Sequence, residues 1–118
     1  MIIIDLFRRL ASAARRLGSD LVGRLTPSVR VTFVGDRPTH LRRNILYVTS
    51  GAEGPAFGFL RCPCGCGETL HLRFFGTRHP QWRLTTDRKR IVTLTPSVWR
   101  QTGCKSHFVL RKGRIFWC

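Results

Sequence analysis

The chain has 118 residues, of which 21 are Lys or Arg and 6 are Asp or Glu, so its formal net charge is +15 at pH 7. This length suits one globular domain, and a hydrophobic content of 42% is enough for a modest core. The charge favours an acidic partner such as nucleic acid, an anionic lipid surface or an acidic protein face. The six acidic residues are scattered, so no carboxylate pair for acid and base catalysis is visible.

Residues 1–26 are predicted to form a basic amphipathic helix that ends before Pro27. Arginines flank a stripe of apolar residues at steps of three or four, namely Ile3, Phe7, Leu10, Ala14, Leu17, Leu21 and Leu25. This stripe could pack on the rest of the chain, dock on a partner or lie on an anionic membrane surface. The apolar residues precede the arginines, the reverse of a signal peptide, and no uncharged run reaches the length of a membrane span. We therefore expect a soluble, cytoplasmic protein.

Residues 27–118 are predicted to form a mainly β domain, a small antiparallel meander of hairpins, which makes the chain α+β overall. Short β-branched and aromatic runs alternate with Gly, Pro, Asp or Asn. Tight turns are expected at Lys112-Gly113 and from Asp87 to Lys89. One helical turn is expected in "LTPSVWRQTGC", with Thr95 as its cap, Pro96 in the first helical position and Gly103 at its end.

Three of the five cysteines lie at alternate positions of "RCPCGCGETL". Cysteines this close rarely reach the geometry of a relaxed disulfide, so metal binding is the better interpretation. Gly65 and Gly67 allow the backbone to curl so that amide groups point at sulfur. The sequence "GCKSHF" adds Cys104 and His107 at a spacing that suits one shared ion. We call residues 62–66 the first knuckle and residues 104–107 the second knuckle.

The two knuckles predict a structural zinc site, because thiolate and imidazole ligands in a closed tetrahedral set suit zinc. The candidate ligands are Cys62, Cys64, Cys66, Cys104 and His107. The favoured set takes Cys104, His107 and two of the three early cysteines, while an alternative set includes Cys118. No metal role is expected for His40, His71 and His79, and His71 is predicted to face solvent on a strand.

The chain also resembles a family of small bacterial proteins of uncharacterised function. The resemblance covers about residues 31–117 and is carried by "CPCGCGETLHL", "TLTPSVW" and "GCKSHF". Some members of this family are encoded beside bacterial ubiquitin-like conjugation components. The resemblance implies metal binding by Cys62, Cys64, Cys66, Cys104 and His107 and a protein partner from such a system.

These observations favour a non-catalytic, zinc-stabilised interaction module. The expected role is that of an adaptor or ligase-like accessory that holds a conjugating or activating enzyme. The alternative is a basic nucleic-acid-binding module, supported by interleaved aromatic and basic residues in "HLRFFGTRHPQWRL". Catalysis is disfavoured, because Glu68 is the one carboxylate next to the candidate ligands and because the clustered thiols favour ligation over nucleophilic chemistry.

Overall fold

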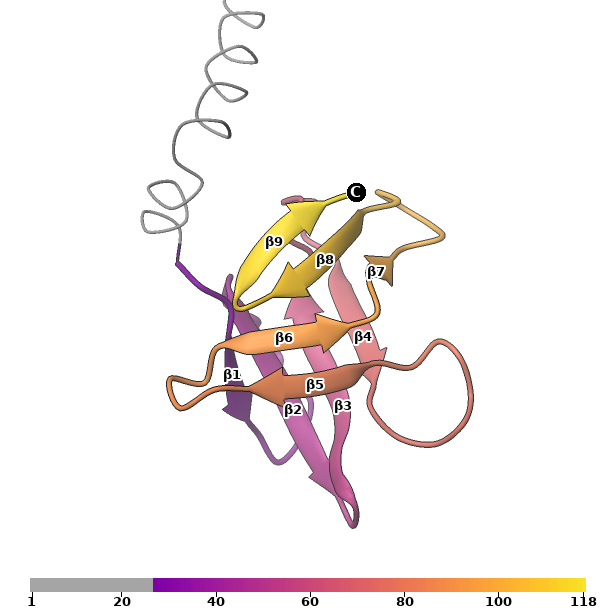
Figure 1. The fold of residues 1–118 in the computed structure, drawn as a ribbon. Helices are drawn as coiled ribbons and strands as arrows, with labels where there is room; N and C mark the ends of the chain where they lie inside the picture. The colour runs from indigo at the N-terminus through magenta and orange to yellow at the C-terminus, as the bar shows by residue number, and fades with distance from the viewer. Residues whose placement is uncertain (1–26) are drawn as a thin grey trace, which may run out of the picture.

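A computed structural model describes residues 27–118, which form nine β-strands arranged in three small sheets (Figure 1). The first sheet has the order β1-β2-β3-β4, with bounds Arg30–Phe33, Ile45–Gly51, Gly54–Arg61 and Thr69–Arg73. The second sheet pairs β5 (Arg83–Thr86) with β6 (Val92–Thr95). The third has the order β7-β8-β9, with bounds Val98–Trp99, His107–Arg111 and Arg114–Trp117.

The fold class predicted from the sequence is wrong. The described residues are all-β and contain no helix, so the class is not α+β. The helix predicted for residues 1–26 lies outside the described residues. The meander is also incomplete, because β1 pairs with β2 in parallel, whereas every other strand pair is antiparallel in the part of the chain described.

The helical turn predicted in "LTPSVWRQTGC" is wrong as well. Val98 and Trp99 form the short strand β7, in register with Phe108 and His107 of β8. The Val98 side chain is buried in the core. The local cap and proline signals that favour a helix are weak compared with the burial of a branched apolar side chain and the pairing of its backbone.

The two turns predicted between strands are confirmed. β5 and β6 form a hairpin around Asp87, whose carboxylate accepts hydrogen bonds from the backbone N–H groups of Lys89 and Ile91 at 2.8 and 2.9 Å. β8 and β9 are joined through Lys112 and Gly113, both with positive φ. Two consecutive positive-φ residues give the turn whose twist matches antiparallel strands.

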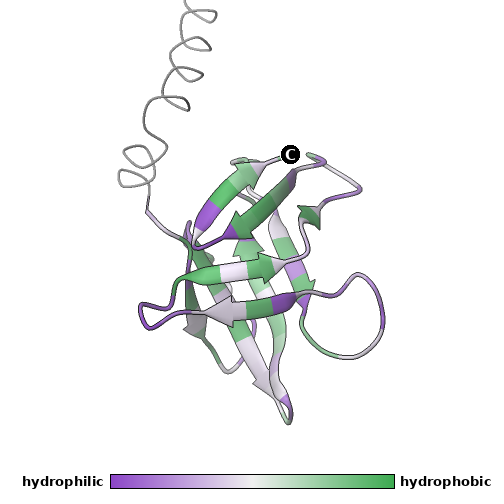
Figure 2. Ribbon diagram, in the orientation of Figure 1, coloured by the Kyte–Doolittle hydropathy of each residue, from purple (hydrophilic) through white to green (hydrophobic). Residues whose placement is uncertain are grey.

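One core lies between the sheets, built from inward-facing residues of most strands. Its buried members are Val29, Val31, Leu46, Val48, Leu60, Cys62, Leu70, Leu72, Val92, Leu94, Val98, Phe108 and Leu110. Figure 2 shows hydrophobic residues along the strands and hydrophilic residues in the loops that follow β4 and β5. Among residues 27–118 no helix is long and apolar enough to cross a membrane.

The three sheets meet at a corner held by backbone hydrogen bonds. Val29 N–H donates to Gly113 O, Gly113 N–H donates to Val92 O, and Val92 N–H donates to Val29 O, at 2.7 to 3.1 Å. A Cβ at Gly113 would lie 2.8 Å from Ile91 Cγ2 and from Ser28 Cβ. Glycine is therefore required here by space as well as by its φ of +76°.

Candidate metal centre and serine–histidine pair

The first knuckle closes the hairpin between β3 and β4. Cys62 follows the last residue of β3, and its N–H donates to Glu68 O at 2.8 Å, just before β4 begins. Gly65 and Gly67 have φ values of +89° and +84°, with open space around both. These glycines are needed for their backbone conformation, which L side chains rarely adopt. The tight loop also directs the N–H of Cys66 at Cys64 Sγ, 3.3 Å away, as predicted.

The second knuckle ends the connection between β7 and β8. Arg100 N–H donates to Ser106 O at 2.8 Å, and Lys105 N–H donates to Thr102 O at 3.3 Å. Gly103 and Lys105 both have positive φ, which folds the loop back on itself. This fold places Cys104 beside the first knuckle, although the two knuckles are far apart in sequence.

Four cysteine sulfurs, from Cys62, Cys64, Cys66 and Cys104, lie within 4.8 Å of one another. We call them the cysteine cluster. Cys62 Sγ lies 3.3 Å from Cys64 Sγ and 3.7 Å from Cys104 Sγ. Four sulfurs bound to one tetrahedral zinc ion at about 2.3 Å would lie about 3.8 Å apart. The donor set and its spacing therefore fit one metal ion.

Polar groups next to the cysteine cluster already favour the thiolate form of Cys104. Ser106 Oγ lies 3.1 Å from Cys104 Sγ and 3.4 Å from Cys62 Sγ. The hydroxyl and the backbone N–H of Ser106 lower the pKa of Cys104 to about 5. Burial raises the pKa of Cys62 to about 12. A bound cation would reverse that second effect, because thiolate is the ligating form of cysteine.

Arg100 supplies a positive charge at the edge of the cysteine cluster. Its Nη1 donates to Cys104 Sγ at 3.2 Å and to Cys66 Sγ at 3.7 Å. Four thiolates on one divalent ion leave a net negative charge, so a neighbouring guanidinium stabilises the loaded site. Arg100 thus links the cluster to the end of β7.

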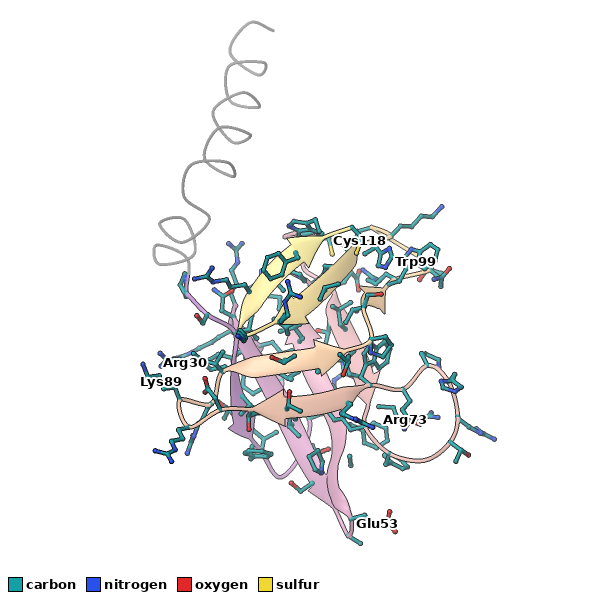
Figure 3. The ribbon with its side chains drawn as sticks, in the orientation of Figure 1. Arg30, Glu53, Arg73, Lys89, Trp99 and Cys118 are labelled. Carbon is teal, nitrogen blue, oxygen red and sulfur yellow. The ribbon has the colours of Figure 1, made fainter. Side chains whose placement is uncertain are left out.

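The other two sequence candidates lie outside the cysteine cluster in the structure. His107 Nε2 lies 3.0 Å from Ser97 Oγ, and the imidazole stacks on the Trp99 ring with 4.8 Å between centroids and 11° between planes. Cys118 is exposed, and its backbone N–H donates to His107 O at 2.9 Å. Figure 3 shows Trp99 and Cys118 at the same end of the domain. His71 is exposed on β4, as predicted.

Ser97 and His107 form the arrangement of a nucleophile and a base. A hydroxyl becomes nucleophilic when an adjacent imidazole nitrogen removes its proton, which requires hydrogen-bond contact of about 2.6 to 3.2 Å. The Ser97 backbone is fixed by the Trp82 indole, whose Nε1–H donates to Ser97 O at 3.2 Å. Both side chains are half-buried. The pair can support acyl transfer.

Sequence reasoning did not identify Ser97, Ser106 or Arg100 as site residues. Ser97 lies in "TPSVW", within the predicted helical turn, and Ser106 directly precedes His107 in the second knuckle. The missing signal was spatial, because the Cys-x-x-His spacing of Cys104 and His107 fits a shared metal as well as it fits two neighbouring sites.

A cavity of about 210 Å³ lies beside this pair, between β4 and β7. It is lined by residues 69–72, by Trp82 and by residues 98–102. Trp82 and Trp99 therefore contact both the cavity and the serine–histidine pair.

Comparison with known proteins gives one family. A family model described as "Bacterial ubiquitination-like system serine protease (BubE)" matches residues 33–118. The matched region contains both knuckles, Ser97 and His107. No curated protein and no solved structure matches the chain.

Proposed function

The chain belongs to the BubE family of bacterial ubiquitination-like systems, and from this membership and the site geometry we propose that it is a serine peptidase. Ser97 is the nucleophile and His107 the general base. The observation that carries the proposal is the 3.0 Å contact between Ser97 Oγ and His107 Nε2. The description of the family as a serine protease supports the same chemistry.

The reaction follows from the two side chains. Ser97 Oγ attacks the carbonyl carbon of the scissile bond while His107 Nε2 takes the hydroxyl proton. The tetrahedral intermediate collapses, the bond to the leaving amine breaks, and His107 gives its proton to that amine. Water then loses a proton to His107 and attacks the ester carbonyl, which releases the acid product and regenerates the Ser97 hydroxyl.

Trp99 orients the His107 imidazole, which is one function of the aspartate in a Ser-His-Asp catalytic triad. Among residues 27–118 no carboxylate hydrogen-bonds the His107 imidazole, so its orientation has another source. The nearly parallel Trp99 ring packs against the imidazole and limits its rotation. An indole face also attracts the imidazolium that forms when His107 accepts the proton.

The metal has a structural role in this proposal. Cys62, Cys64, Cys66 and Cys104 would hold the ion, and four thiolates would leave no position for a reacting water. Zinc is the proposed ion, because it favours closed thiolate sites. Ser106 contacts two of the four sulfurs and directly precedes His107, so the loaded cysteine cluster fixes the start of β8 and with it the base.

The proposed substrate is a protein of the ubiquitination-like system. A protein partner from such a system is also what the sequence predicts. The adaptor role and the nucleic-acid-binding alternative both stay predictions. The serine–histidine contact favours catalysis over either, because neither binding role requires a hydroxyl within hydrogen-bond distance of a half-buried imidazole.

Cleavage of a fused substrate tests the proposal. A ubiquitin-like protein of a bacterial ubiquitination-like system, extended at its C-terminus by a short tail, is incubated with the purified protein and followed by intact mass. We expect release of the tail at one position. An adaptor would instead form a stable complex and leave the tail in place, and recovery of that uncleaved complex by size-exclusion chromatography would contradict the peptidase assignment.

A further inference from the structure

Two strand edges face the cavity between β4 and β7. In the described part of the chain β4 pairs with β3 alone, and β7 pairs with β8 alone. Residues 69–72 of β4 and residues 98–100 at β7 line the same cavity, and Figure 1 shows the two strands close together. The edge of a sheet presents unpaired backbone groups that can accept another strand.

The hydrogen-bond pattern identifies which backbone groups of β4 point away from β3. Phe74 N–H donates to Ala56 O, and Glu68 O accepts from Cys62 N–H, so even-numbered residues face β3. Arg73 O instead accepts from Trp82 N–H on the other side at 2.8 Å. Odd-numbered residues therefore face outward. Trp82 occupies one outward group at Arg73, and those of Thr69 and His71 have no partner among residues 27–118.

The Trp99 backbone lies on the open side of β7. Arg100 N–H donates to Ser106 O across the β7–β8 pair, whereas Ser97 O accepts from the Trp82 indole on the opposite side. The N–H and C=O of Trp99 therefore point away from β8. An extended chain in the cavity would meet β4 on one side and reach Trp99 and Ser97 on the other.

The charge around the cavity selects among extended chains. None of the residues that line it is acidic, although Glu68 directly precedes the first of them. Arg100 is among the lining residues, with its guanidinium against Cys104 and Cys66 Sγ. Arg73 and Arg83 lie at the neighbouring ends of β4 and β5. A segment with acidic side chains complements this surface, whereas a basic segment is repelled.

We propose that the peptidase binds its substrate as an extended, acidic segment that adds to the outward edge of β4 at Thr69 and His71. The cavity receives one of its side chains, and the scissile carbonyl reaches Ser97 beyond Trp99. This inference rests on the proposed function for the role of Ser97. The binding itself uses backbone hydrogen bonds and charge, as in other cases of strand addition to a sheet edge.

Peptide binding to Ser97→Ala tests this inference without turnover. The probe is a short fluorescent peptide that alternates valine and glutamate, measured by fluorescence anisotropy. His71→Pro removes the outward N–H and keeps the β3–β4 hydrogen bonds, because His71 does not donate to β3. His71→Ala is the matched control, because it removes the same imidazole and retains the N–H. We expect His71→Pro to weaken binding at least about tenfold relative to His71→Ala.

A second measurement leaves the protein unchanged. The same peptide with alternate N-methylated amides cannot donate to a strand edge, and its binding should fall at least about tenfold, while a lysine-for-glutamate peptide should bind more weakly still at low salt. Equal binding of the methylated and unmethylated peptides would overturn the inference. Serine-dependent hydrolysis of a small ester by the parent protein, measured in parallel, shows whether the proposed function holds independently of strand addition.

Discussion

Ser97→Ala is expected to lower kcat for cleavage by at least about 10³-fold, because it removes the nucleophile itself. His107→Gln should lower kcat by about 10² to 10⁴-fold, the usual contribution of a positioned general base. The double variant should be no slower than Ser97→Ala, since the two groups act as one unit on one proton. The measurement is single-turnover cleavage of the tailed substrate.

The control for these variants is Ser50→Ala. Ser50 is an exposed serine at the end of β2, and its hairpin with β3 lies at the opposite end of the domain from Trp99 (Figures 1 and 3). It should retain the parent rate. Full activity in Ser97→Ala protein whose mass confirms the substitution and whose melting temperature is unchanged would show that another residue carries the reaction.

Loss of the metal is expected to have the second largest effect. The protein should contain about one zinc ion per chain, and a strong chelator should abolish its cooperative thermal unfolding. Free energies of zinc binding are on the order of 10 kcal/mol in small zinc domains and are part of the folding free energy. Chelation should also suppress cleavage, because the cysteine cluster holds Ser106 and so the start of β8.

Single cysteine variants distinguish the ligands. Cys62→Ser and Cys104→Ser should lose the zinc and the folded state, since each removes one member of a four-sulfur set. Cys118→Ser is the matched control and should keep both, because Cys118 is exposed and lies outside the cysteine cluster. A metal-free protein with an unchanged melting curve would contradict a structural role for the metal.

The strands and their turns could be predicted because they are local. The run "HFVLR" alternates buried side chains, those of Phe108 and Leu110, with half-buried or exposed ones. Lys112-Gly113 has the residue type that a tight turn requires. The strand at Val98 could not be predicted in this way. Its local signals indicate a helix, and only the core and the partner strand β8 outweigh them.

The candidate site also has a part that local sequence predicts and a part that depends on the folded structure. Grouped cysteines and glycines identify the first knuckle directly, because its candidate ligands all lie in one short stretch of sequence. The partner of His107 was not predictable, since Ser97 reaches the imidazole only after β7 pairs with β8. The link to a ubiquitin-like system came from the motifs and is confirmed by the family match.

The central claim is that His107 activates Ser97 as a nucleophile. Its most direct test is covalent labelling with a fluorophosphonate, which reacts with serines activated by a neighbouring base. We expect one adduct per chain, mapped by peptide mass spectrometry to Ser97, and its loss in His107→Gln protein that retains zinc. Absence of labelling in folded, zinc-loaded protein, or labelling that is unchanged in Ser97→Ala, would contradict it.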